Sequence, residues 1–375
     1  MEKCQIGNGK SRSVELLAPA RDYDSVVAAV DYGADAVYIG GARFGARQAA
    51  GNSTEQIARA VEYAHRYGVR IHATLNTLLW DDELADAERQ ARELIAAGID
   101  ALIVQDMALR RMDLPVELHA STQVSNRTPE GARFLGEAGF ARVILERNLS
   151  LDEIRAICAA TQAEVECFVH GAICVGYSGR CFLSRSMSGR SGNRGACSQP
   201  CRLTYDLTDG RGRTYLTGKH LLSVRDLNLS DHLGELLDAG VRSFKIEGRL
   251  KDTNYIRNVV AYYRQAVDAA LASRLTYGTV QNQILLDWYL RHFSSVRLKK
   301  IAPRVLACLR MGLYQLILMD KIPAHAAVAE TVALVKHYGH ANDRTVAFAN
   351  AVLRNAANAA QNGSLPREDR RPWHR

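Results

Sequence analysis

The sequence lacks several features that would place it in a familiar class of protein. No stretch of its 375 residues approaches the roughly 18 consecutive apolar residues that a membrane-spanning helix needs. The first residues, MEKCQIGNGKSRS, are polar and lack the apolar core of a secretory signal. There is no G-x-S-x-G motif of a serine hydrolase and no H-E-x-x-H motif of a zinc protease. We therefore expect a cytoplasmic protein that carries neither of these two catalytic motifs.

Acidic residues are scarce in the last quarter of the chain. Residues 274–375 contain 15 Lys and Arg against 6 Asp and Glu, whereas residues 1–273 contain 33 against 34. The whole net charge of +8 therefore originates from the C-terminal part. This asymmetry favours a nucleic-acid-binding appendage on a near-neutral body; the alternative is a solvated basic face.

Four cysteines are the most informative residues that are present. Cys174, Cys181, Cys197 and Cys201 have the spacing C-x6-C-x15-C-x3-C, in a segment rich in Gly, Ser and Arg without apolar periodicity. Cytoplasmic cysteine clusters bind metal or carry out redox chemistry more often than they form disulfides. An iron–sulfur cluster is favoured over zinc, because zinc sites usually pair two close C-x2–4-C knuckles and only one pair here is that close. Free thiols remain the third alternative.

Five arginines lie in the sequence around these cysteines and indicate which kind of substrate could bind there. Positive charge would stabilise four thiolates, and the same side chains could hold an anionic substrate such as RNA phosphate or a dicarboxylate. The alternative is a solvated loop. The residues are Arg180, Arg185, Arg190, Arg194 and Arg202.

Short apolar, β-branched runs alternate with helical patterns over residues 14–272. Several helical patterns end in a glycine that is followed by the next strand, as at Gly33, Gly68, Gly98, Gly139 and Gly240, and such a glycine supplies the left-handed residue of a helix cap. Eight strands that alternate with helices predict a closed (β/α)8 TIM-like barrel, with the cysteine segment inserted between the seventh and eighth strands. The expected strands are Glu15–Ala18, Ala36–Ile39, Arg70–Leu75, Ala101–Gln105, Glu117–Ala120, Arg142–Leu145, Glu164–Val169 and Ser243–Ile246.

The chain changes character after about Leu275. Strand signals stop, and four helical patterns with apolar residues at helical spacing follow, two of them opened by Pro303 and Pro323. We predict four parts: a disordered N-terminus over 1–13, the barrel over 14–273, an all-α domain over 274–360, and a disordered basic tail over 361–375.

The first 270 residues resemble the collagenase-like peptidase family U32. The motifs ELLAPA, YGADAVYIGG, TLNTLL, DALIVQD, LHASTQ, VHGAICVGYSGRCFLS, GRSGNRGACSQPCR and SFKIEGRLKDTNY stand in the family's order. Relatives look like iron–sulfur proteins of oxygen-independent hydroxylation, acting on a tRNA wobble uridine, a ribosomal RNA cytidine or the ubiquinone ring. The resemblance implies that the four cysteines ligate a 4Fe–4S cluster and that prephenate supplies the hydroxyl group. Three positions depart from the family pattern: Arg21 replaces a glycine, Asn148 replaces a glutamate, and Asn126 is displaced from the usual place of an asparagine. If the lost glycine or glutamate shapes the pocket, we expect reduced or altered activity.

The last hundred residues resemble a different family. TYGTVQNQILLDWYLRHF, LKKIAPRVLACLRMGLYQLILMDKIPAHAAVAETVALVK and FANAVLRN are similar to the NusB-type RNA-binding domain of 16S rRNA 5-methylcytosine methyltransferases. About two helices precede the TYGT-like segment in that family, so the resemblance implies a truncated NusB-like domain fused to the barrel.

These observations predict an iron–sulfur enzyme that hydroxylates a tRNA or rRNA base, with RNA and a partner protein for the cluster chemistry as partners. The alternatives are a U32 collagenase-like peptidase and a non-enzymatic RNA-binding protein with a degenerate barrel. Polar residues at the carboxyl ends of the strands are the candidates for the site. The expected catalytic residues are His119, Lys245, Glu247 and Arg249; the expected substrate-binding residues are Asn76, Gln123, Arg147, His170, Arg180 and Arg194; the expected RNA-binding residues are Lys299, Lys300, Arg304 and Arg310; the expected metal ligands are Cys174, Cys181, Cys197 and Cys201.

Overall fold

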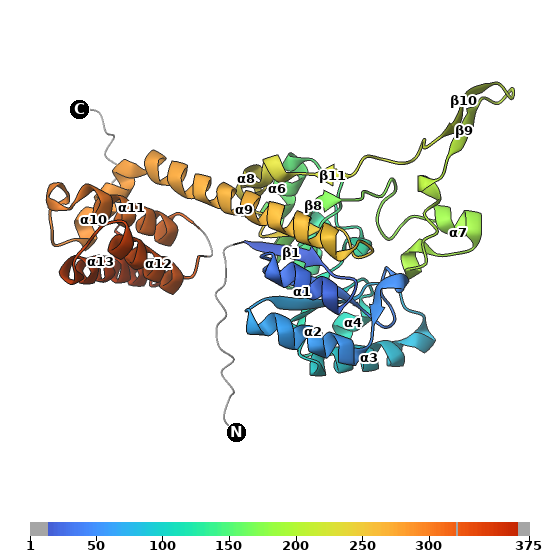
Figure 1. Cartoon of the computed structure of the whole chain (residues 1–375), viewed down its shortest axis with the longest axis horizontal. Coiled ribbons are helices and arrows are strands. Elements are labelled where there is room, and N and C mark those ends of the chain that lie inside the picture. Colours follow the sequence, from blue (N-terminus) through green and yellow to red (C-terminus); the bar gives the residue numbers. More distant parts are fainter. Residues whose placement is uncertain (1–13, 320–321, 367–375) are drawn as a thin grey trace. The chain divides into compact units, whose positions relative to one another are not determined.

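The computed structural model describes residues 14–319 and 322–366, and its first part is a closed parallel barrel (Figure 1). Eight parallel strands follow one another in the order β1-β12-β8-β7-β6-β5-β4-β2, and pairing of β1 with β2 closes the ring. Leu17 on β1 has Lys245 opposite it on one side and Ala36 on the other. The strands are β1 Glu15–Pro19, β2 Ala36–Gly41, β4 Arg70–Leu75, β5 Ala101–Val104, β6 Glu117–Ala120, β7 Arg142–Ile144, β8 Glu164–Gly171 and β12 Ser243–Ile246.

The helices between these strands begin and end where local chemistry dictates. Ser53 and Ser150 each form a reciprocal capping box with the third residue of the helix that follows. All five predicted cap glycines have a positive φ, from +69° at Gly68 to +110° at Gly240, which confirms their role. The helices of the barrel region are α1 Tyr23–Asp31, α2 Thr54–Arg66, α3 Leu84–Ala96, α4 Ala108–Arg111, α5 Pro129–Glu137, α6 Leu151–Ala160 and α8 Leu233–Ala239.

A long insertion separates β8 from β12, as predicted. It contains α7 (Leu183–Ser188), an antiparallel pair formed by β9 (Tyr205–Thr208) and β10 (Thr214–Lys219), and the short strand β11 (Leu227–Asn228), which pairs with β8. The four cysteines precede β9.

The barrel interior has an apolar layer above a charged layer. Residues such as Leu17, Ile103 and Phe168 form the apolar layer. Below it, the buried guanidinium of Arg142 donates to carboxylates of Glu15 and Glu166, at 2.9 Å for Glu166. Burial opposes ionisation of both carboxyls, but the charge of Arg142, joined by that of Lys245 at Glu166, lowers both pKa values below their usual range.

The C-terminal part is all-helical. α9 runs from Thr253 to Gln281 without interruption, so the predicted border at 273/274 falls inside one helix. By their contacts, residues 14–267 form one compact unit and the residues from Asp268 onward form another. The second unit contains the end of α9 with α10 Gln283–Phe293, α11 Pro303–Ile317, α12 Ala324–His337 and α13 Asp343–Gln361, packed around a core that includes Leu290, Leu309, Leu313 and Leu353.

The segments expected to be disordered lie mostly outside the described residues. Residues 1–13 and 367–375 are not described, whereas Gln361 ends α13 and residues 362–366 follow it without helix or strand. Among the described residues, no helix is both long enough and apolar enough to span a membrane.

Candidate active site

A cavity of about 420 Å³ lies at the carboxyl ends of the barrel strands, a size typical of small-molecule sites. Its floor is formed by strand residues that include Tyr38, Ile103 and Phe168. Its wall is formed by the cysteine-bearing insertion, and all four clustered cysteines line it. The position at the C-terminal face of the barrel is where TIM-barrel enzymes carry out their chemistry.

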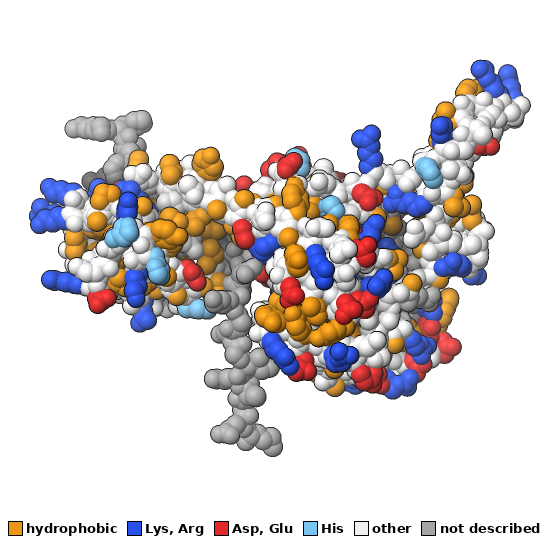
Figure 2. Space-filling view, in the orientation of Figure 1, with side chains coloured by type: hydrophobic (Ala, Val, Ile, Leu, Met, Phe, Trp, Pro, Cys, Tyr) orange, Lys and Arg blue, Asp and Glu red, His pale blue; other side chains and the backbone are white. Residues whose placement is uncertain are grey.

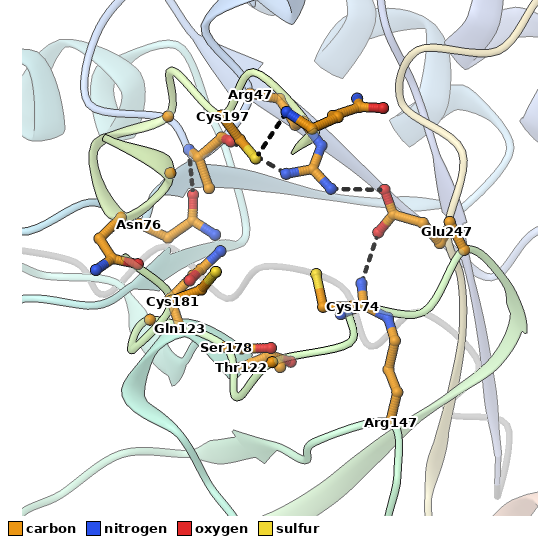
Figure 3. Close-up of a pocket in the computed structure, with 18 of the residues that line it drawn as sticks. Arg47, Asn76, Thr122, Gln123, Arg147, Cys174, Ser178, Cys181, Cys197 and Glu247 are labelled. Atoms are coloured by element: carbon orange, nitrogen blue, oxygen red, sulfur yellow. Dashed lines mark hydrogen bonds and ion pairs between the residues drawn. The ribbon is translucent and has the colours of Figure 1, made fainter. Parts of the chain in front are cut away.

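The four thiols share one open space. Figure 3 shows the sulfurs of Cys174, Cys181 and Cys197 facing the same central region. Gly176 and Gly192 lie beside two of them, and a Cβ at either position would be 3.7 Å from the Sγ of Cys181 or Cys197, an ordinary van der Waals contact. Among residues 14–319 and 322–366, no three His, Cys, Asp or Glu side chains are drawn together as ligands of one metal ion. The donor set of four thiols fits the soft-ligand chemistry of an iron–sulfur or zinc site.

The cysteine segment is fastened to the barrel by charged and polar contacts. Ser178 donates from its backbone nitrogen and its hydroxyl to Glu146, which follows β7, at 2.9 Å each. Arg194 donates to both oxygens of Glu83 at 2.6 and 2.7 Å, and these bonds lower the pKa of Glu83 to about 2. The cysteines are therefore held over the barrel mouth by contacts on two sides.

Positive charge dominates the cavity. Glu247 accepts from Arg147 Nη2 at 2.8 Å and lies 3.7 Å from Arg47 Nη2 (Figure 3). The cavity is also lined by Arg249, which donates to Thr74 Oγ1 at 2.9 Å. Burial opposes ionisation of Glu247, but the three guanidinium groups lower its pKa below its usual value. One carboxylate thus faces three arginines, and the surplus charge suits an anionic ligand.

Lys245 connects the cavity to the charged layer beneath it. Its ammonium donates to Glu166 Oε1 at 2.8 Å and lies 4.3 Å from the centre of the Tyr38 ring. Burial lowers the pKa of Lys245, and Glu166 opposes this effect. Lys245 therefore lines the cavity, and the carboxylate of Glu166 in the charged layer neutralises its charge.

Two amides shape the opposite side of the cavity. Asn76 accepts from the backbone nitrogen of Ala46 at 2.9 Å and donates to Ser121 Oγ at 3.0 Å, which fixes its orientation. Gln123 lines the same space, and its backbone carbonyl accepts from Gln105 at 3.0 Å. The structure therefore brings Asn76, Gln123, Arg147, Lys245, Glu247 and Arg249 together with the four cysteines.

The remaining candidates lie outside the cavity lining. His119, expected in the mouth, points into the barrel interior below Ser121, because side chains alternate along a strand and Ser121 occupies the next inward position. His170 packs edge-on against Tyr263, with 5.3 Å between ring centres. Arg194 is committed to Glu83, and Arg180 is exposed beyond the lining.

A pair of buried histidines was not foreseen. His72 and His119 are fully buried, with ring centres 4.9 Å apart, and neither nitrogen of His72 has a hydrogen-bond partner among the described residues. Burial lowers the pKa of both imidazoles, most strongly for His72. The folded barrel therefore holds them neutral, whereas the unfolded chain takes up protons near pH 6.5.

This pair makes the stability of the barrel depend on pH. Both folded pKa values lie below the unfolded value, so the free energy of unfolding should fall as pH decreases from 7.5 through 6.5 to 5.5. The slope is at most about 1.4 kcal/mol per pH unit for each histidine. Urea titrations across this range measure it, and His72→Phe should flatten the slope. An unfolding free energy that is constant between pH 7.5 and 5.5, or an unchanged slope in the variant, would contradict this assignment.

The predicted RNA-binding residues of the helical unit differ in their availability. Lys299 and Lys300 are exposed on a short 3-10 turn, and Arg304 is exposed at the start of α11. Arg310 instead forms a bidentate pair with Asp287 at 2.7 and 2.8 Å. Arg310 therefore ties α11 to α10, whereas Lys299, Lys300 and Arg304 are exposed and form no ion pair with another residue of 14–319 or 322–366.

Two protein-family models match this chain. The model of peptidase family U32 matches residues 21–299, which include every strand of the barrel from β2 onward and all four clustered cysteines. The chain belongs to peptidase family U32. A NusB family model also matches residues 245–358. The U32 and NusB matches overlap over residues 245–299, which contain α9 and α10, and both predicted resemblances are confirmed.

Curated U32 relatives differ in their described activities. The chain is 55% identical over 265 residues to "23S rRNA 5-hydroxycytidine C2501 synthase" of Escherichia coli, covering 70% of this chain and 41% of that protein. It is 41% identical to "tRNA hydroxylation protein P1" of Bacillus subtilis, covering 71% of this chain and 67% of that one. It is 34% identical to "Collagenase" of Porphyromonas gingivalis, covering 68% and 66%. The chain therefore spans less than half the length of the E. coli relative.

Proposed function

We propose that this U32 barrel holds an iron–sulfur cluster and hydroxylates a base in ribosomal or transfer RNA. The observation that carries the proposal is a cavity at the barrel mouth whose lining includes all four clustered cysteines and five arginines: Arg47, Arg147, Arg190, Arg202 and Arg249. The E. coli and B. subtilis relatives, whose names describe rRNA and tRNA hydroxylation, support RNA as the substrate. The exposed Lys299, Lys300 and Arg304 on the helical unit support contact with a polyanion.

Cys174, Cys181, Cys197 and Cys201 would hold the cluster, which supplies redox chemistry when bound. The protein's own side chains bind and orient the reactants. Arg47 and Arg147, spaced by Glu247, present fixed guanidinium groups to a carboxylate or phosphate, so a dicarboxylate hydroxyl donor such as prephenate suits the cavity. Asn76 and Gln123 offer amide groups of the kind that recognise the edge of an unpaired base.

Nucleoside mass spectrometry tests this function in cells. RNA from cells that express the chain should contain a base with one added oxygen atom that is absent from cells without it. Cleavage of gelatin by cluster-free protein would support the peptidase alternative. RNA binding with a steep salt dependence but no modified base would support the non-enzymatic alternative.

Arg47 gives a sharper test of the cavity. Arg47→Ala removes a guanidinium that faces the cavity, so kcat/KM should fall about tenfold to a hundredfold, the loss expected for a hydrogen bond to a charged group. Arg43→Ala is the matched control, because Arg43 pairs with Asp86 outside the cavity lining. Equal hydroxylation rates in the two variants would contradict a role for Arg47 in binding.

A further inference from the structure

The insertion carries a concentrated positive charge that the overall balance of the barrel hides. From Cys167 to Tyr205 the chain has five arginines and no Asp or Glu, and residues 167–225 contain nine Lys and Arg against two Asp and Glu. The first 273 residues are nearly neutral only because the rest of them is acidic. This local charge adjoins the cavity and is separate from the basic helical unit.

The antiparallel pair β9–β10 forms a ribbon that projects beyond the body of the barrel (Figure 1). No residue of either strand is buried, and all six residues of β10 are exposed. A two-stranded ribbon is marginally stable by itself, and this one contributes no side chain to the core. Tyr215 and Leu207 nevertheless expose about half of their surface, 54% and 47%.

The two acidic residues of the ribbon are engaged within the ribbon: both accept from its backbone, and Asp209 Oδ2 also accepts from the Tyr215 hydroxyl at 3.2 Å. Asp209 accepts from the backbone nitrogens of Arg211 and Arg213 at 2.9 and 3.0 Å and shapes the turn. Asp206 accepts from the nitrogen of Gly218 at 2.7 Å. The side chains of Arg211, Arg213 and Lys219 make no ion pair with any described residue. Figure 2 shows Lys and Arg side chains gathered at the far end of the ribbon.

The base of the ribbon is tied to the cysteine segment. Tyr205 donates to the carbonyl of Pro200 at 2.7 Å, one residue before the ligand candidate Cys201. Arg202, which follows Cys201, donates to Ser223 Oγ at 2.7 Å and to the carbonyl of Ile173 at 2.8 Å, so it holds the segment that follows β10 against the start of the insertion. The ribbon therefore starts at the rim of the cavity.

We propose that the β9–β10 ribbon is an RNA-holding arm that acts beside the cavity, in addition to the helical unit. Arg211, Arg213 and Lys219 contact phosphates, and Tyr215 stacks on an unpaired base that flanks the target. Free cations beside an exposed aromatic ring, with the nearby acids engaged, suit single-stranded RNA. The Arg213 guanidinium already lies 5.1 Å from the centre of the Tyr215 ring. The inference rests on the proposed function in taking RNA as the substrate.

Binding measurements on the full-length, cluster-loaded protein test the arm. The probe is a transcript of the 23S rRNA segment that contains C2501, titrated at several salt concentrations, with a tRNA transcript for comparison. Arg211→Ala with Arg213→Ala should weaken binding about tenfold and reduce the slope of log K against log salt by about 1.5, the effect of two lost phosphate contacts. The matched control is Arg133→Ala with Arg257→Ala, which removes the same charge from exposed helix surfaces and should change neither value by as much.

Tyr215 separates stacking from charge. Tyr215→Ala should weaken binding roughly fivefold or more, whereas Tyr215→Phe retains the ring and should bind like the parent. Parent-like binding by both the double arginine variant and Tyr215→Ala overturns the arm, even where hydroxylation occurs. Ribbon-dependent binding without hydroxylation supports the arm and overturns the proposed function. A third outcome is that the ribbon variants bind RNA like the parent and lose turnover only when the reductant is an acidic electron-transfer protein. That result would show that the ribbon docks a protein and would overturn the RNA arm.

Discussion

Cys181→Ser should abolish hydroxylation and remove the visible colour of anaerobically purified protein. Cys181 lines the cavity with the three other clustered cysteines, and a serine hydroxyl is a poor ligand for iron. The barrel should remain folded, because Cys181 lies on the insertion and not in the strands or their core. Iron and sulfide analysis together with far-UV circular dichroism measure both parts of this expectation.

Cys158→Ser is the matched control for that substitution. Cys158 lies in α6, outside the cavity lining, so the variant should retain colour, iron and activity. Stoichiometric zinc in a colourless parent protein would instead favour the zinc alternative. An active, iron-containing Cys181→Ser protein would show that this thiol is not a ligand.

Arg142→Leu should destabilise the barrel by about 3–5 kcal/mol, the cost of breaking a buried ion pair by removing one partner. The side chain of Arg142 is 2% exposed, and its guanidinium pairs with Glu15 on β1 and with Glu164 and Glu166 on β8. Without it, Glu15 and Glu166 remain buried beside each other, and only Lys245, bonded to Glu166, and the half-exposed Arg70, paired with Glu15, compensate their charge. Urea denaturation of the full chain, followed by circular dichroism, measures the loss.

Arg155→Leu provides the comparison on the surface. Arg155 pairs with Asp152 in α6, and both side chains are more than half exposed, at 53% and 91%. Surface pairs of this kind contribute about 0–1 kcal/mol. Similar losses in the two variants would contradict the account of the charged layer.

The barrel could be predicted because two local signals agree along the chain. Apolar, β-branched runs marked all eight strands, and glycines such as Gly98 and Gly240 marked helix ends that the backbone confirms with positive φ values. The insertion between β8 and β12 followed from the same alternation. The fold confirms the predicted (β/α)8 architecture with a following helical region.

The details of the site were less accessible to sequence reasoning. Arg47 carried no signal beyond its position in a loop after β2, and its contact with Glu247 joins residues 200 positions apart. His119 was placed at the mouth because it lies one residue before the end of β6, and His72, in the middle of β4, gave no separate signal of a buried histidine pair. The ribbon arginines were hidden because charge was summed over the whole barrel.

Two of the predicted binding residues form ion pairs within the protein. Arg310 pairs with Asp287 and Arg194 with Glu83, and neither pairing follows from composition, because each partner lies on another element. The identity of the cluster, the hydroxyl donor, the partner protein and the cytoplasmic location remain predictions. The residue roles in the cavity are likewise proposals that the variants above address.

One reconstitution tests the central claim most directly. Anaerobic, cluster-loaded protein is incubated with reductant, prephenate and either a 23S rRNA transcript or a tRNA transcript, and the nucleosides are analysed by mass spectrometry. We predict a nucleoside with one added oxygen atom, formed by the parent protein and absent with Cys181→Ser. Unmodified RNA with the intact, iron-loaded parent, tested on both rRNA and tRNA transcripts, would contradict the assignment of this barrel as an RNA hydroxylase.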